Sequence, residues 1–157
     1  MKLIQSTKNP ELKQLRLLFE KARERKKKKL FVIEGEREIK KAILSDYSFT
    51  QVFMEDGSAP VEPEVQTLAL HTPAFRVERK AFERISKRSG SEKIMAVAQI
   101  KSHELGDLTL TDQALVLVIE APEKPGNIGA LFRTAAAAKM DAVIIANPKT
   151  DFYNPNS

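Results

Sequence analysis

The stretch that decides the fold is 114–146, ALVLVIEAPEKPGNIGALFRTAAAAKMDAVIIA. Its two ends, 114–121 and 141–146, are continuous apolar runs, which are typical of strands buried on both faces of a parallel sheet. Between them lie a loop and an alanine-rich helix that we predict over 128–139. The sequence therefore predicts a βαβ unit, and its crossover should be right-handed on general grounds.

The loop and the first turn of this helix carry the residues that could take part in binding or catalysis. Asn127 stands where its side-chain oxygen can cap the helix, and the free N–H groups of a helix start favour an anion or a developing negative charge. Gly126 and Gly129 allow a ligand to approach the backbone closely. Arg133 is four residues after Gly129 on the same helix face, and helical side chains lean toward the N-terminus. We expect an anion-favouring pocket at the carboxyl ends of the strands.

The same spacing also fits a simpler structure, in which an alanine face packs on a sheet and one arginine is exposed. PGNIG matches neither the dinucleotide fingerprint nor a P-loop. Spacing alone leaves both interpretations open.

Helices and strands also alternate in the part of the chain that precedes residue 102. Asn9-Pro10 is a helix start, and its apolar periodicity predicts one helix that reaches the basic run at 24–29. The further predicted elements are strands at 30–33, 49–55, 74–78 and 93–99, and helices at 37–44, 64–69 and 80–86. This pattern predicts a small α/β layer structure. The polar stretch 102–113 marks a boundary, so we expect domains at 1–104 and 114–157 with a linker at 105–113.

Charge is distributed unevenly along the 157 residues. Residues 1–41 hold 14 Lys/Arg and 6 Asp/Glu, a surplus of +8, whereas 42–157 hold 12 and 15, a deficit of −3. A basic front on a near-neutral body points to an anionic partner, for which nucleic acid is the leading candidate. A solvated helix face is the alternative. The candidate phosphate contacts are Lys13, Arg16, Arg25, Lys26, Lys27, Lys28, Lys29 and Arg37.

Several classes of site are not expected from the composition. The chain has no cysteine, so it has no disulfide frame and no thiolate ligand or nucleophile. His71 and His103 are isolated in sequence, so we expect ordinary surface or loop residues and no metal site. No apolar run is long enough to span a bilayer, and the N-terminal MKLIQSTKNP lacks the core of a signal peptide. We expect a cytoplasmic protein without membrane partners.

The segment 120–146 resembles the first signature motif of the SpoU/TrmH family of RNA methyltransferases, which runs roughly N-x-G-x-x-x-R-T-A. The matching residues are Asn127, Gly129, Arg133, Thr134 and Ala135. Residues 9–43 are similar to the RNA-substrate-binding extension of many members, including the element F-x-x-E-G-x-R at Phe31, Glu34, Gly35 and Arg37. The segment 151–156, DFYNPN, resembles the part that follows the second strand in that family. These matches stand in the expected order.

The resemblance implies an RNA 2′-O-ribose methyltransferase that uses S-adenosylmethionine and has a dimeric, trefoil-knotted catalytic domain. It assigns catalysis to Asn127 and Arg133, with Arg133 stabilising the developing negative charge or anchoring a phosphate. A guanidinium stays protonated and is a poor general base. Ribosomal RNA is the favoured substrate and transfer RNA the second. Phe31 lies in an apolar strand, where we expect it to join the core rather than stack on a base.

The second and third family motifs do not occur within these 157 residues, so the sequence assigns no cofactor-binding residues. We expect the chain to be the front part of a longer protein. Two alternatives stay open: an RNA-binding module that cannot bind the cofactor, and a nucleotide-handling α/β protein whose Arg133 holds a free phosphate.

Overall fold

The computed structural model describes residues 1–87 and 92–155. The chain divides into two compact units, Met1–Lys101 and Ser102–Ser157, and each is described by itself. The predicted first domain, 1–104, extends slightly beyond the first unit. Asn156, the last residue of the predicted family segment 151–156, lies outside the described residues.

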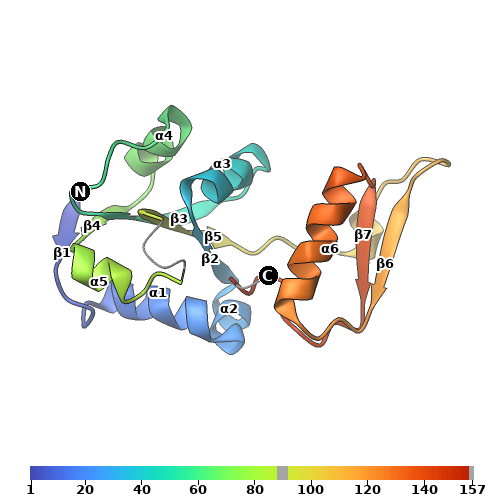
Figure 1. Ribbon diagram of the computed structural model, residues 1–157, viewed down its shortest axis with the longest axis horizontal. Helices are drawn as coiled ribbons and strands as arrows, with labels where there is room; N and C mark the ends of the chain where they lie inside the picture. The colour runs from blue at the N-terminus through green and yellow to red at the C-terminus, as the bar shows by residue number, and fades with distance from the viewer. Residues whose placement is uncertain (88–91, 156–157) are drawn as a thin grey trace. The chain divides into compact units, whose positions relative to one another are not determined.

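The first unit is a three-layer α/β structure (Figure 1). In chain order its elements are β1 (Lys2–Ile4), α1 (Pro10–Glu20), α2 (Ala22–Lys28), β2 (Leu30–Glu34), α3 (Glu36–Leu44), β3 (Phe49–Glu55), α4 (Pro63–His71), β4 (Ala74–Val77), α5 (Arg79–Glu83) and β5 (Ile94–Gln99). The strands form one mixed sheet in the order β1-β4-β3-β5-β2. β1, β4 and β3 run parallel, whereas β5 is antiparallel to both of its neighbours.

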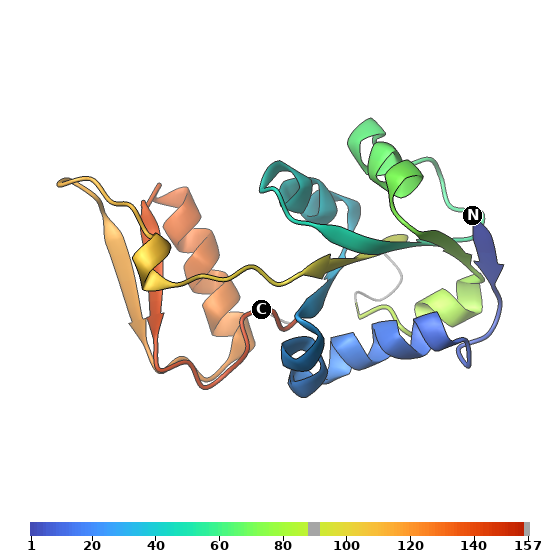
Figure 2. The ribbon, with the colours of Figure 1, turned by 180° about the vertical axis from the view of Figure 1, so that it is seen from behind.

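Helices cover both faces of this sheet (Figures 1 and 2). One core cluster joins α1 and α5 to the sheet through residues such as Leu15, Phe53 and Phe82. The other joins α3 and α4 to the opposite face through residues such as Ile39 and Val65. β5 shows the consequence, because all of its residues from Ile94 to Ala98 are buried and alternate between the two clusters.

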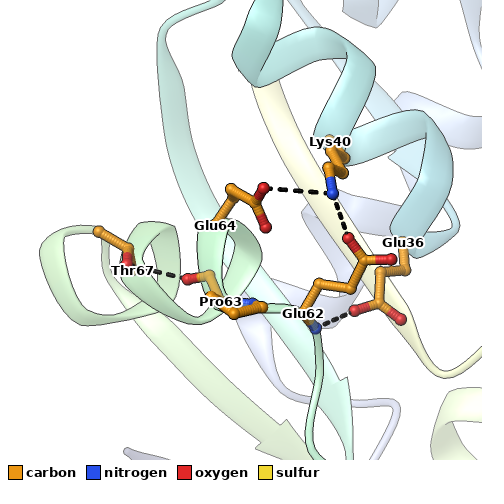
Figure 3. A network of polar contacts seen from close by, with 6 residues as sticks. All are labelled: Glu36, Lys40, Glu62, Pro63, Glu64 and Thr67. Carbon is orange, nitrogen blue, oxygen red and sulfur yellow. Dashed lines mark hydrogen bonds and ion pairs between the residues drawn. The ribbon is translucent and has the colours of Figure 1, made fainter.

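A polar network ties α4 to α3 (Figure 3). The Lys40 ammonium on α3 contacts the carboxylates of Glu62 and Glu64, the latter at 3.2 Å. The Glu36 carboxylate accepts a hydrogen bond from the backbone N–H of Glu62. Thr67 Oγ1 donates to the Pro63 carbonyl at 2.9 Å within α4. The first turn of α4 is therefore fixed by charges on its neighbour as well as by its buried face.

The N-terminal part differs from the predicted elements at two places. β1 was not predicted, because three residues are too few to show a pattern, and it is ordered by pairing with β4. The helix predicted from Pro10 through 24–29 is two helices, because Lys21 has an extended backbone (φ −121°, ψ 107°) that ends α1 and precedes α2. The break changes the direction in which the following basic residues point.

The second unit contains the predicted βαβ arrangement. A short 3-10 turn (Leu105–Asp107) precedes β6 (Val116–Glu120), α6 (Pro125–Ala137) and β7 (Ala142–Ala146). β6 and β7 pair in parallel over five residues, from Val116 with Ala142 to Glu120 with Ala146. α6 packs its buried residues Ile128, Gly129 and Ala135 inward. Within the described residues the strands are less covered than predicted, since Val118 is 62% exposed.

Candidate functional site

The first turn of α6 differs from the predicted capped helix. Pro125 occupies the first turn and Lys124 is the N-cap, with no side-chain capping bond. Proline fixes a helical φ and has no N–H to satisfy, so the helix begins before Asn127. The prediction that Asn127 caps the helix was therefore wrong. Its side chain is exposed in the first turn, beside the backbone N–H groups of the helix start.

Arg133 lies on α6 one turn after the buried Gly129. Its side chain is exposed, and it has no ion pair or side-chain hydrogen bond to the described part of the chain. Six residues separate Arg133 from Asn127, which corresponds to about 120° around the helix axis and about 9 Å along it. The two side chains therefore leave the helix in different directions. The long arginine side chain, which leans toward the N-terminus, is what can bring its charge near Asn127. Their catalytic roles stay predictions.

The loops that follow β6 and β7 are linked to each other. Asn147 Nδ2 donates to Glu120 Oε1 at 3.0 Å, and Lys149 Nζ lies 2.7 Å from Glu123 Oε1. Ala121 and Asn147 each follow their strand directly and adopt left-handed conformations, with φ of 46° and 48°. A non-glycine residue in this region persists when its surroundings hold it there, and such residues gather at functional sites. Sequence reasoning missed these links, since nothing in the pattern pairs Glu120 with Asn147.

The lysines of the predicted RNA-binding set are exposed. Lys13 and Arg16 lie on the outer side of α1, and Lys26, Lys27, Lys28 and Lys29 lie at the end of α2 and just after it. Lys28 Nζ donates to Gln14 Oε1 on α1 at 3.1 Å, so α1 and α2 contribute to one basic surface. Arg16 forms an ion pair with Glu20 at 2.8 Å, and this hydrogen bond raises the pKa of Arg16 and lowers that of Glu20.

Arg25 is the exception, and its prediction as a phosphate contact was wrong for the free protein. Its side chain is buried, with 1% of its surface exposed. Nη1 donates to the carbonyl oxygens of Leu18 at 2.6 Å and Phe19 at 3.1 Å. The break at Lys21 turns Arg25 toward the end of α1, where helix carbonyls lack partners within the helix. The guanidinium therefore binds backbone carbonyls in the interior of the first unit.

Arg37 is exposed at the start of α3, but it does not lie in the same group as the lysines. Lys29 precedes β2 and Arg37 follows it, and five extended residues span about 16 Å. The structure therefore separates the predicted RNA-binding residues into a larger group on α1 and α2 and a single residue at the far end of β2.

The F-x-x-E-G-x-R element has a structural role that its residues explain. Glu34 is 7% exposed, and its carboxylate accepts hydrogen bonds from Ser86 Oγ and from the backbone N–H of Lys87. Gly35 has φ of 109°, and a Cβ there would lie 2.6 Å from the Glu38 carboxylate. Phe31 packs against the second core cluster and meets Tyr47 edge-on, with ring centroids 5.5 Å apart. Three of the four motif residues thus organise the fold, and Arg37 points outward.

The described residues contain neither a cluster of metal-ligating side chains nor a membrane-spanning helix. No group of three or more histidine, aspartate or glutamate side chains there could hold a metal ion. No helix of the described chain has the length and apolar character to cross a membrane.

The chain thus combines an α/β unit that carries an exposed basic surface with a βαβ unit that carries an exposed arginine. Residues 9–96 match the family model of the MRM3-like substrate binding domain, and residues 114–157 match that of the SpoU rRNA Methylase family. The first match alone covers more than half of the chain. The chain belongs to the SpoU/TrmH methyltransferase family with this N-terminal substrate-binding domain.

Curated relatives are similar over both units. The 23S rRNA (guanosine(2553)-2′-O)-methyltransferase RlmP of Bacillus subtilis is 29% identical over 154 residues, which is 98% of this chain and 58% of the relative. A 23S rRNA (uridine(2479)-2′-O)-methyltransferase of Streptomyces viridochromogenes is 28% identical over 71 residues, 45% of this chain and 25% of the relative. The chain thus spans about 58% of the length of the first of these enzymes.

Solved structures share the fold. An RNA 2′-O ribose methyltransferase superposes with a TM-score of 0.80 at 33% identity, covering 98% of this chain and 58% of that one. The AviRb methyltransferase of Streptomyces viridochromogenes, solved with its cofactor AdoMet, gives 0.81 at 19% identity over 94% of this chain and 55% of that one. At this identity the second likeness concerns the fold alone.

Proposed function

We propose that this chain is the RNA-binding part and the beginning of the catalytic part of an S-adenosylmethionine-dependent 2′-O-ribose methyltransferase that acts on ribosomal RNA. One observation carries the proposal. The similarity to the Bacillus 23S rRNA methyltransferase runs through 98% of this chain, across both units and in the same order.

The first unit supplies the affinity for RNA. Lysines on α1 and α2 form an exposed basic surface, and such surfaces bind phosphates by releasing counterions. Phosphate contacts orient the RNA but do not read its sequence. The described residues of this surface include no exposed aromatic side chain on which a base could stack. Selection of the target nucleotide therefore depends on the shape of the RNA or on the second unit.

The second unit supplies groups for the reaction at the ribose. Methyl transfer breaks the carbon–sulfur bond of the sulfonium, forms a carbon–oxygen bond to the 2′-hydroxyl, and releases the hydroxyl proton. Arg133 is exposed and not paired within the described chain, so its charge is available to the attacked oxygen or to the adjacent phosphate. Asn127, beside the N–H groups of the helix start, is placed to orient the ribose. Because the guanidinium stays protonated, another group or water must accept the proton.

The polar side chains after β6 and β7 pair with one another in the described structure. At the carboxyl ends of β6 and β7, Glu120 binds Asn147 and Glu123 binds Lys149. These side chains use one another as partners, so we assign none of them to the cofactor. The knotted chain path, the homodimer and a cytoplasmic location are further parts of the proposal that follow from family membership.

The RNA-binding part is tested by changing Lys26, Lys27, Lys28 and Lys29 together to glutamine. We expect weaker binding of protein-free 23S ribosomal RNA and a shallower plot of log affinity against log salt, by roughly 0.7–0.9 for each lost phosphate contact. Lys139 and Lys149, changed to glutamine in the second unit, serve as a charge control. If the slope of log affinity against log salt were unchanged in the fourfold variant, residues 26–29 would not contact RNA phosphates.

The pairing of these side chains with one another favours a second candidate, an RNA-binding module without methyltransferase activity. Calorimetric titration of S-adenosylmethionine into the purified 157-residue protein, with its intact mass measured on the same sample, separates the two. Binding at the expected mass would show that the pocket forms from these residues, contrary to our assignment. Absence of binding would support the RNA-binding module for this chain.

A further inference from the structure

Helix α2 is too short and too highly charged to be stable without contacts to the rest of the first unit. The helix has seven residues, and its last turn carries Arg25, Lys26, Lys27 and Lys28. A helix of this length is not stable by itself in water, and neighbouring like charges repel. Cations at a helix C-terminus are favoured by the dipole, but only weakly at the surface. Contacts outside the helix must hold it in place.

Arg25 provides the buried contact. It is the one residue of α2 that is buried. Its Nη1 binds the carbonyl oxygens of Leu18 and Phe19, which belong to the last turns of α1. Both of these residues are themselves part of the first core cluster. A buried guanidinium that donates to two fixed carbonyls therefore connects the basic helix to the hydrophobic core.

The orientation of Arg25 determines where the other charges point. On a helix successive residues are about 100° apart, so with Arg25 turned inward Lys27 and Arg23 face outward, Lys26 lies beside them, and Lys28 lies about 60° from Arg25 on the side next to α1. All four are exposed. Lys28 reaches Gln14, the neighbour of Lys13, and so joins this surface to that of α1. Beyond the helix, Lys29 adopts a left-handed conformation, and its carbonyl accepts a hydrogen bond from the Ile100 N–H at 2.9 Å.

We infer that Arg25 is a positioning residue for RNA binding. It contacts no phosphate itself. It docks α2 on the end of α1 and thereby holds the lysines of α2 in a fixed array beside Lys13. This inference rests on the proposed function, because it assigns a role within RNA binding.

The experiment compares Arg25→Gln with Arg23→Gln, which removes an exposed cation from the same helix. Binding of protein-free 23S ribosomal RNA is measured over a series of KCl concentrations. For R25Q we expect affinity about tenfold lower at every salt concentration with the slope of the wild type, because apparent affinity falls with the docked fraction of α2. For R23Q, if it contacts a phosphate, the slope falls by roughly 0.7–0.9. Hydrogen exchange of the amides of 22–29, measured without RNA, should be faster in R25Q and unchanged in R23Q.

The outcomes separate the possibilities. A slope that falls in R25Q would overturn the inference, because Arg25 would then contact a phosphate directly. Unchanged RNA affinity in R25Q, or unchanged exchange of 22–29, would overturn it as well. If R25Q does not fold, Arg25→Lys keeps the charge without the planar fork and should show the same unchanged slope with a smaller loss of affinity. A wild-type protein that binds no RNA would remove the proposed function, while the exchange data would still show whether Arg25 anchors α2.

Discussion

The two units of the chain solve the burial of apolar surface differently. In the first unit, helices cover both faces of the sheet, and the strands β3 and β5 are buried along most of their length. In the second unit, the described buried apolar residues are Ile119, Ile128 and Ala135. The side chains of Leu115 and Val118 are 54% and 62% exposed, although both lie in the apolar run 114–121. The first unit thus has a hydrophobic core on both faces of its sheet. In the second unit the two strands are held mainly by one helix and by the contacts between the loops.

The largest expected effect comes from the core of the first unit. Phe53 is fully buried and stacks on Phe75, with ring centroids 5.2 Å apart. Phe53→Ala should lower the free energy of unfolding by about 3–5 kcal/mol because it leaves a cavity. Hydrogen exchange in urea, followed by mass spectrometry, should show faster exchange throughout Met1–Lys101 and no change in 116–146.

Leu70, which is 74% exposed, is the matched control for that experiment. Leu70→Ala should change the free energy of unfolding by less than about 0.5 kcal/mol. If Phe53→Ala accelerated exchange equally in both units, the two units would unfold together, and the comparison would fail.

The second prediction concerns the left-handed residue that follows β6. Ala121 has φ of 46°, a conformation that costs an alanine about 1 kcal/mol or more and costs glycine almost nothing. Ala121→Gly should therefore raise the free energy of unfolding of the second unit by about 1 kcal/mol. Ala136→Gly, on the exposed side of α6, should lower it by about 1 kcal/mol, since glycine is a poor helix former.

Denaturant titration of both variants, followed by circular dichroism, tests the pair. Opposite signs for the same chemical change would show that backbone conformation decides the outcome. A loss of stability in Ala121→Gly would mean that the loop between β6 and α6 does not hold this conformation in solution.

The smallest effect is expected from the network between α3 and α4 (Figure 3). The pKa of Glu64 is lowered, first by a backbone hydrogen bond at the start of α4 and then by Lys40. The pKa of Lys40 is raised by its hydrogen bonds to Glu62 and Glu64. The stabilisation by Glu64 is present above its ordinary value of 4.5 and is lost as pH falls through its lower folded value. That by Lys40 is present below 10.5 and is lost as pH rises through its raised folded value.

Thermal melts of Lys40→Gln against the wild type, repeated across pH, measure this contribution. The variant should melt slightly lower near neutral pH, and the difference should shrink in acid below about pH 4. Lys41→Gln, which removes an adjacent exposed charge, should show no such dependence. A difference that persisted in acid would assign the effect to packing rather than to charge.

Sequence reasoning succeeded where a pattern is long and failed where a contact is made by one residue. The strands 30–33, 49–55 and 93–99 were predicted close to their observed bounds, because apolar runs of this length have few alternatives. Arg25 was grouped with the lysines because composition does not show which member of a basic run turns inward. The break at Lys21 depends on tertiary packing, and no glycine or proline at that position marks it in the sequence. The sequence does carry a signal for the helix start at Pro125, because proline favours the first helical position, whereas the capping preference of asparagine points to Asn127.

The position of β5 in the sheet affects the order in which the first unit folds as the chain is translated. β2 pairs only with β5 among the described strands, and more than 60 residues of chain separate Glu34 from Gln99. As the chain leaves the ribosome, β2 and the helices before it emerge long before β5, the strand that pairs with β2, exists. The basic surface of α1 and α2 therefore reaches its final geometry only after residues 94–99 insert between β3 and β2. Pairing at such a distance along the chain is slow to form, so we expect the basic surface of α1 and α2 to be completed late in the folding of the first unit.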